Sequence, residues 1–465
     1  MKRACSLDAF RGYAILTMIL SGTILTSVLP PWMSHAQVGP RSGFTFDPSI
    51  YGITWVDLVF PFFLFAMGAA FPFSIGRKLE KGETKGRIVF DCLLRGIRLT
   101  FFAIFIQHMY PWSVSTPQGS LSWGVAITAF FLLFPMFIRL PKSISRWVRV
   151  TVELGACAVG IGMMLLIPYA NGRAFSLGYS NIIILVLANM AIFGSLIYLF
   201  TYRNRWSRVA VLPFVMAVFL GSTTEGSWIA EVMNFTPLPW MYRFFYLKYL
   251  FIVIPGSVAG EYLREWLDGH EAQVEIPMRR IVFWVLLLAV GIIVWNLYGL
   301  YTRKLVLNLW GTVVLLIALY LLLRGSHPEL CYWRKLYVAG AYLLLLGLCF
   351  EAYEGGIRKD DSTYSYYFVT SGLAFMGLMA FSALCDVRRV NRLVSPLQLV
   401  GQNPMIAYVA PQLLIMPLLH LTGLSTWLDM LNQNAWAGFL RGVIVTTLAL
   451  CVAVFCTKKK WFWRT

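Results

Sequence analysis

Charged residues are scarce in this 465-residue chain: they make up 13% of it, against about a quarter in soluble proteins. Acidic residues are the scarcer sign, with 21 Asp and Glu against 39 Lys and Arg. Together with the 58% of apolar residues, this low charge excludes a soluble enzyme. The basic residues lie in short stretches between apolar runs, without a basic stripe or a known binding module, so nucleic acid is not an expected partner.

Cysteine and histidine are also rare. The eight cysteines show neither CxxC nor CxxH spacing, and four of them fall inside apolar runs, so neither disulfides nor a bound metal are expected. The chain has five histidines, at positions 35, 108, 270, 327 and 420. With so few, each can be weighed individually as a catalytic group.

Long apolar runs are abundant instead, and a membrane-spanning helix needs about 20 mostly apolar residues. The sequence predicts an all-α, polytopic transmembrane bundle of about 14 spans, forming one domain over residues 1–465. The count falls to 12 or 13 if the short run 208–222 and the run 397–418, interrupted by Pro404, Pro411 and Pro417, are not true spans. The fourteen runs are 9–29, 53–75, 90–109, 122–140, 150–168, 181–201, 208–222, 243–263, 281–300, 305–323, 335–350, 366–385, 397–418 and 438–457.

Basic residues alternate between rich and poor loops along the chain, which predicts that both termini are cytoplasmic and that His35 lies outside. Asp8 and Arg11 interrupt the approach to the first apolar run, so we expect a retained span and not a cleaved signal peptide. The basic-rich stretches are 2–3, 77–87, 139–149, 203–208, 264–280, 334–336, 388–392 and 458–464, and the poor loops hold Arg41, Arg173, 303–304 and 358–359.

Charged residues inside spans are candidates for function, because burying them is costly. Asp8 and Arg11 are three residues apart on one helix face, so they form either a structural ion pair or a contact for an anionic ligand. Asp57 lies among apolar residues at the outer start of the second span. It either caps its own helix after Thr54 or holds a histidine of the preceding loop, such as His35.

Two blocks of sequence carry a resemblance to a known family: "SLDAFRGYAILTMILSG" (6–22) and "GITWVDLVFPFFLFAMGAAFPFSIGRKLEKG" (52–82), with His35 in the loop between them. "GSVAGEYL" (256–263), "GGIRKDDSTYSYYFVTSGLAF" (355–375) and "PLQLVGQNPMIAYV" (396–409) follow in the same order. These segments resemble the transmembrane acyltransferases related to heparan-alpha-glucosaminide N-acetyltransferase, and bacterial members most of all.

The resemblance implies transfer of an acetyl group from cytoplasmic acetyl-CoA to an amine or hydroxyl of an amino sugar or glycan outside. It places the protein in a bacterial inner membrane, with the His35 loop facing the periplasm and with a homodimer as an expected assembly. It gives the essential histidine role to His35. Two pairs of spans, near 181–222 and 281–323, are additions to the family core. Gly22 stands where the family has an asparagine, so Thr23 or Asn403 would have to replace that group.

On this reading His35 is a general base or an acyl carrier, Asp57 orients it, and Asn403 binds the developing oxyanion. Asp8 joins Arg11, Arg95 and Arg98 at the coenzyme, because guanidinium groups suit phosphate, although Arg95 and Arg98 are equally explained as topology charges. The expected acceptor contacts are Trp32, Gln37, Lys359, Tyr364 and Tyr366, and interfacial anchoring explains the aromatic ones as well. The rival function is a transporter or flippase of a small sugar or lipid-linked glycan.

Overall fold

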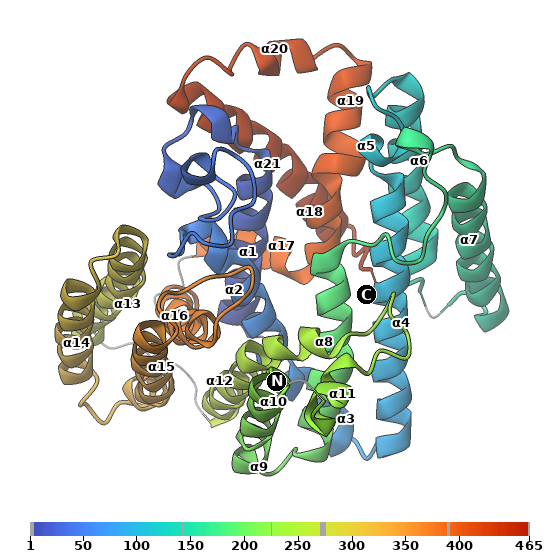
Figure 1. The fold of residues 1–465 in the computed structure, drawn as a ribbon. Helices are drawn as coiled ribbons and strands as arrows, with labels where there is room; N and C mark the ends of the chain where they lie inside the picture. Colours follow the sequence, from blue (N-terminus) through green and yellow to red (C-terminus); the bar gives the residue numbers. More distant parts are fainter. Residues whose placement is uncertain (1–3, 142, 225, 270–275, 388–390, 464–465) are drawn as a thin grey trace.

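The computed structural model describes residues 4–141, 143–224, 226–269, 276–387 and 391–463, with the backbone alone at 276–279 and 391–393. These residues contain many helices and no β-strand, and the only bridge pairs Ile138 with Trp463. Among them, eleven helices are long and apolar enough to cross a membrane. The chain is therefore a polytopic helical membrane protein, as the sequence predicted (Figure 1).

Most of the predicted runs form one helix each. The helix α2 (Trp55–Ala69) continues through the π-helical turn η4 (Pro72–Gly76) into α3 (Arg77–Glu80). Two further helices, α1 and α4, are not among the eleven, and both carry charged side chains. The other long helices are α1 (Cys5–Thr23), α4 (Lys85–Met109), α6 (Ser120–Phe137), α7 (Arg146–Leu166), α8 (Ile182–Phe200), α12 (Leu250–Gly269), α13 (Ile276–Thr302), α14 (Leu305–Leu322), α15 (Pro328–Tyr353), α16 (Tyr364–Ser382) and α21 (Ala435–Lys458).

The structure corrects the prediction of a single spanning helix at 208–222. That stretch forms α9 (Arg205–Val209) and α10 (Val211–Gly221), and α10 has only 11 residues. Eleven residues extend about 16 Å as a helix, roughly half the hydrocarbon thickness of a bilayer. The chain then continues through α11 (Trp228–Asn234) and the 3₁₀ turn η6 (Phe244–Tyr249) before α12 begins.

The run 397–418 is broken, as its prolines predicted. Its helices are α17 (Asn391–Gln402), α18 (Pro404–Ala410), the π-helical η8 (Pro411–Ile415) and α19 (Met416–Leu421). Asn403 has non-helical backbone angles, and Pro404 and Pro411 each begin the next segment. Proline removes a backbone donor and clashes with the preceding turn, which explains the break at Asn403; beyond it, Pro404–Leu421 continues through the π-helical turn as one helix and is among the eleven candidate spans.

The bundle has two distinguishable ends (Figure 1). We call the end that holds residues 24–54 the His35 end; there Gly52 N donates to Ile357 O (2.8 Å), which ties this loop to the loop before α16. We call the opposite end, where α9 lies, the Arg208 end; there Arg205 Nε contacts Glu261 of α12 at 2.6 Å.

The core of the bundle lies around α16 and α2. Of the most apolar stretch of 18 residues in each, 89% and 83% of the residues are buried. In α7 and α14 the shares are 17% and 22%, and Figure 1 shows α7 at one edge and α13 and α14 at the other. The pair of spans predicted near 281–323 corresponds to α13 and α14. These helices therefore lie at the periphery, where two additional helices can be accommodated. By contrast, α8 is buried against α4 and α12, so the structure gives no peripheral place to 181–222.

Glycines allow α1 to pack directly on α17. A Cβ atom on Gly12 would lie 1.9 Å from Leu397 O, and one on Gly401 would lie 1.9 Å from Asp8 O. Small residues commonly permit such close approach of helices in membranes. The contact fixes the half of α1 that carries Asp8 and Arg11.

We expect Gly12→Ala to lower the stability of the purified protein by about 1–3 kcal/mol, because the added methyl group overlaps the backbone of α17. Gly162→Ala on α7 is the matched control, since a Cβ there meets no described atom within 4 Å. Thermal unfolding in detergent measures both variants. Equal melting temperatures for the two would contradict the packing described here.

Candidate active site

Four side chains meet at the His35 end, and we call them the His35 cluster: His35, Asp57, Lys359 and Asp360. His35 Nε2 lies 3.3 Å from Asp57 Oδ1 and 3.1 Å from Asp360 Oδ2. Lys359 Nζ lies 3.8 Å from Asp57 Oδ1. His35 is 17% exposed, Asp57 is fully buried and Asp360 is 45% exposed, so the cluster runs from the interior to the surface.

Asp57 fulfils both roles that the sequence suggested. It is the third residue of α2, and its Oδ2 accepts hydrogen bonds from Thr54 N (2.9 Å) and Ala36 N (3.4 Å). Its Oδ1 faces His35 and Lys359, and no described residue donates a hydrogen bond to it. One oxygen thus caps the helix and the other is directed at the imidazole.

The backbone of the loop determines the tautomer of His35. Gln37 N donates to His35 Nδ1 at 3.1 Å, so Nδ1 is an acceptor and the neutral ring carries its proton on Nε2. The Nε2–H group faces Asp57 and Asp360. In this conformation both ring nitrogens are engaged, whereas the sequence led us to expect one nitrogen left open as a base.

Asp360 was missed by the sequence reasoning, although it follows Lys359 directly in "RKDD". Gln37 binds its backbone twice: Gln37 Nε2 donates to Asp360 O (3.0 Å), and Asp360 N donates to Gln37 Oε1 (2.9 Å). Burial raises the pKa of Asp360, but the hydrogen bond from His35 and the charge of Lys359 outweigh it, so the pKa is lowered. The carboxylate is therefore ionised at neutral pH.

The predicted acceptor contacts divide into two groups. Gln37 and Lys359 belong to or border the cluster, and Trp32 is 53% exposed beside it. Tyr366 is fully buried, and its hydroxyl donates to Asp57 O at 2.8 Å, so it supports the cluster from beneath and is not accessible to a sugar. Tyr364 is also buried, 9% exposed, among aromatic rings of α12 and α15.

Asn403 does not share a site with His35. Its Nδ2 donates to Trp461 O at 2.6 Å, just beyond the end of α21. The other end of α21 meets the residues after α1, because a Cβ on Gly442 would touch Ile24. Lys458 lies sixteen residues beyond Gly442, about 24 Å along the helix, so Asn403 lies toward the Arg208 end and the oxyanion role predicted for it is not supported.

The predicted coenzyme contacts also separate. Arg98 forms an ion pair with Glu153 of α7 and faces away from α1. Arg11 and Arg95 are close enough for their charges to interact, and Arg11 also interacts with Asp8 and donates to Gly401 O (3.3 Å). Arg95 is exposed although it shares a helix face with Leu99 and Phe102, which are buried.

A cavity of about 330 Å³ lies beside the last turns of α1. It is lined by Gly22, the amides Gln107, Asn181 and Gln412, and the half-exposed Trp112. A Cβ on Gly22 would meet no described atom within 4 Å. The position of the family's asparagine is therefore open space, and three other amides surround it.

The other histidines have structural contacts. His108 is buried among Tyr169, Phe175 and Tyr179, with Nδ1 2.8 Å from Ile104 O. His420 stacks on Trp123 with ring centroids 4.3 Å apart. His327 precedes α15 as its N-cap residue, and His270 lies outside the described residues. Among the described residues, no group of His, Cys, Asp or Glu is arranged to hold a metal ion.

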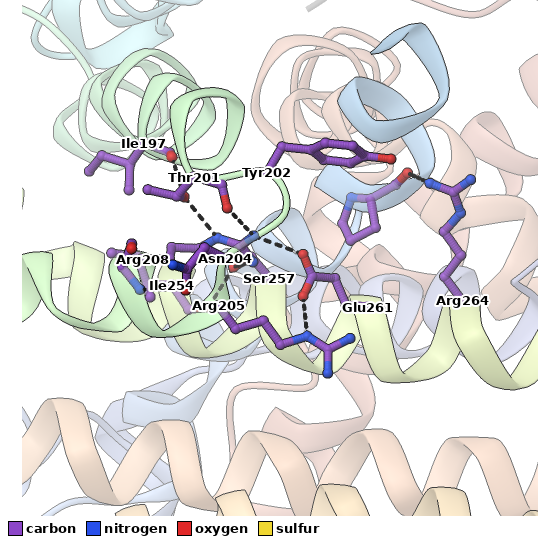
Figure 2. A network of polar contacts seen from close by, with 12 residues as sticks. Ile197, Thr201, Tyr202, Asn204, Arg205, Arg208, Ile254, Ser257, Glu261 and Arg264 are labelled. Carbon is purple, nitrogen blue, oxygen red and sulfur yellow. Dashed lines mark hydrogen bonds and ion pairs between the residues drawn. The ribbon is translucent and has the colours of Figure 1, made fainter. Parts of the chain in front are cut away.

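A second polar network lies at the Arg208 end, and sequence reasoning had treated its arginines as topology charges (Figure 2). Arg208 is fully buried; it donates to Glu261 Oε1 (2.8 Å), Ser257 Oγ (3.0 Å) and Thr201. Arg205 approaches the same carboxylate from the exposed side. Arg205 also pairs with Glu265, so two arginines meet two carboxylates and join α9 to α12; we assign the network a structural role.

We expect Arg208→Gln to destabilise the protein far more than Arg205→Gln, although both arginines contact Glu261. Removing one partner of a buried ion pair costs about 3–5 kcal/mol, and an exposed partner contributes about 0–1 kcal/mol. Chemical or thermal unfolding of the two variants in the same detergent measures the difference. Equal losses would show that burial does not govern this network.

The lowered pKa of Asp360 gives a pH dependence. A carboxyl whose folded pKa is depressed stabilises the protein above its ordinary pKa of 3.8, and this contribution disappears as the pH falls through the folded value. The difference in melting temperature between wild type and Asp360→Asn should be constant at neutral pH, decrease as the pH falls through about 4, and vanish only below the folded pKa of Asp360, which is lower still. Asp361→Asn, next to it but outside the cluster, is the control. A difference unchanged down to pH 3 would contradict the assignment.

Comparison with known proteins gives a family but no activity. Residues 3–263 match the family described as a domain of unknown function, DUF5009. A search of curated proteins returns no match. The matched stretch is more than half of the chain, and it includes His35 and Asp57 but ends before Lys359 and Asp360.

Proposed function

We propose a function from the site itself, because the chain belongs to the family DUF5009, whose description gives no activity. The proposal is a membrane-embedded acetyltransferase that moves an acetyl group from acetyl-CoA to an amine or hydroxyl of an amino sugar or glycan. The observation that carries it is the His35 cluster: an imidazole of fixed tautomer, held against a buried carboxylate at one end of a membrane bundle.

The distribution of basic loops supports an orientation. The stretches rich in Lys and Arg include 77–87 and 203–208, which lie at the Arg208 end, so we place that end in the cytoplasm. The His35 end then faces the periplasm of a bacterial inner membrane. Acetyl-CoA would bind from one side and the acceptor from the other, as the resemblance implies. A homodimer remains a prediction of that resemblance.

A route for the thioester is supported by the surroundings of α1. Arg11 and Arg95 lie near one another toward the Arg208 end, where guanidinium groups suit the coenzyme phosphates. The cavity beside Gly22 lies 11 residues farther along α1, about 16 Å away, which an extended pantetheine arm can bridge. Its amides are suitable donors for a thioester carbonyl.

The chemistry at His35 starts from the resting geometry. His35 Nδ1 can accept a proton only after it separates from Gln37 N, while Nε2–H remains directed at Asp57. Gln37 also holds Asp360, so an acceptor that opens this contact between the two loops would expose Nδ1. Until the acceptor arrives, the hydrogen bond from Gln37 N therefore prevents His35 Nδ1 from accepting a proton.

In the transfer step, Nδ1 takes a proton from the acceptor amine or hydroxyl as that group attacks the thioester carbonyl carbon. A new bond to carbon forms, the carbon–sulfur bond breaks, and the imidazolium returns the proton to the departing thiolate. Alternatively Nδ1 attacks the thioester carbonyl carbon, the carbon–sulfur bond breaks and CoA leaves as the thiolate; the acetyl group then passes from Nδ1 to the acceptor, whose proton ends on the thiolate. Both routes use the same nitrogen and the same Asp57 contact.

Transport of a sugar or lipid-linked glycan is the second candidate. The break at Asn403 between α17 and α18 and the charge interaction between Arg11 and Arg95 favour it, since transporters build midplane sites from such elements. The two candidates differ in a covalent product. Acetylated acceptor supports the enzyme, and sugar flux in liposomes without acetylation supports the transporter.

We expect His35→Ala to reduce acetyl transfer by at least about a hundredfold, the usual contribution of a general base. His420→Ala, a histidine of the same end but outside the cluster, should retain wild-type activity. The measurement uses purified protein in detergent, radiolabelled acetyl-CoA and a panel of amino sugars. Wild-type rates in His35→Ala would remove this residue from the mechanism.

A further inference from the structure

A second pocket lies beside the His35 cluster, and its lining is almost wholly apolar. Its volume is about 590 Å³, and its walls come from Trp32, the start of α2 and the end of α13. Thr54 belongs to both sites: it lines the pocket, and it binds Asp57 Oδ2 and, through its hydroxyl, Ser34 O (2.8 Å). A molecule in the pocket is thus one residue away from the cluster.

The pocket opens toward the lipid-facing surface. Val294 and Tyr298 of α13 line it and are 59% and 47% exposed, and α13 itself lies at the edge of the bundle (Figure 1). In a helix that crosses a membrane, such exposed apolar side chains face hydrocarbon. The natural occupant of an apolar pocket in that position is a hydrocarbon chain.

A positively charged side chain, Arg41, lies at the outer rim of this pocket. The guanidinium carbon of Arg41 lies 4.7 Å from the ring centroid of Tyr301, another lining residue. Arg41 is exposed at the His35 end, where the headgroup of a lipid would lie. Guanidinium groups bind phosphate well, so the rim complements an anionic headgroup and the interior complements its chain.

We infer that this pocket binds the hydrocarbon chain of an anionic amphiphile, and that the acceptor reaches His35 as the headgroup of such a lipid. The first statement stands on the pocket alone, and the second rests on the proposed acetyl transfer. Substrates would then enter sideways from the bilayer, with the chain in the pocket and the reactive amine or hydroxyl at the cluster.

Binding is tested without reference to catalysis. The probe is hexadecyl phosphate with a photoreactive diazirine in its chain, added to the full-length protein in phosphatidylcholine nanodiscs. We expect crosslinks in residues 53–55 and 294–302, and competition by unlabelled hexadecyl phosphate but not by inorganic phosphate. Hexadecanol should compete less well, and Arg41→Gln should abolish the advantage of the phosphate.

Matched variants separate the pocket from general lipid contact. Val294→Trp at the pocket mouth should reduce labelling about tenfold, whereas Val290→Trp, one turn away and 43% exposed, should leave it unchanged. Leu297→Trp, deeper in the pocket, is the second variant if Val294→Trp does not fold. Equal labelling in all variants, or labels spread along the lipid face of α13 and α14, means bulk lipid only and overturns the inference.

Catalysis tests the second statement. Wild type should acetylate hexadecyl glucosaminide with a KM at least about tenfold lower than that for methyl glucosaminide, and Val294→Trp should lose this preference while keeping its rate on the methyl compound. Equal KM values in wild type would overturn the lipid-linked acceptor. If neither compound is acetylated, the acetyltransferase proposal fails, and the crosslinking result still decides whether the pocket binds lipid.

Discussion

The buried carboxylate of Asp57 is the interaction on which the arrangement at the His35 end depends. A carboxylate without any exposure is unfavourable unless hydrogen bonds and a counter-charge compensate it. Oδ2 is compensated by the backbone of α2 and by the loop around Ala36. Oδ1 has only the nearby His35 and Lys359, so the carboxylate requires both to stay close.

This requirement joins two loops that are more than 300 residues apart. The loop 24–54 supplies His35, and the loop before α16 supplies Lys359 and Asp360. Gln37 closes the contact with two hydrogen bonds to the Asp360 backbone. Because α2 and α16 are the most buried helices, the ends that carry these loops are firmly placed, while the loops themselves remain accessible at the surface. Two loops held on buried helix ends thus keep the side chains of the His35 cluster together at the surface of the bundle.

The sequence predicted the helices well because the hydrocarbon thickness fixes their length and hydropathy. It left 208–222 open, and there the apolar stretch has the composition of a span but too few residues before Gly221 to form one helix across the membrane. The pairing of His35 with Asp57 was foreseen because one residue starts a span and the other precedes it. Asp360 was not, since a charged loop residue has no periodic signal and its position depends on tertiary contacts. Asn403 was misplaced for an avoidable reason: its run follows the basic stretch 388–392, which the alternation of loops predicts to lie opposite the His35 loop, so an early position in that run is far from His35.

The pocket beside Thr54 relates the kind of acceptor that could reach His35 to the two helices that the resemblance implies are additions to the family core. One of its walls is α13, which belongs to the pair 281–323 at the edge of the bundle. If that pair is an addition to the family core, as the resemblance implies, then the core alone keeps only the wall formed by Trp32 and the start of α2, and the pocket is not closed on the side of α13. The helices around His35 would then hold the chemistry in common, and the added pair would decide whether the acceptor arrives from water or from the bilayer.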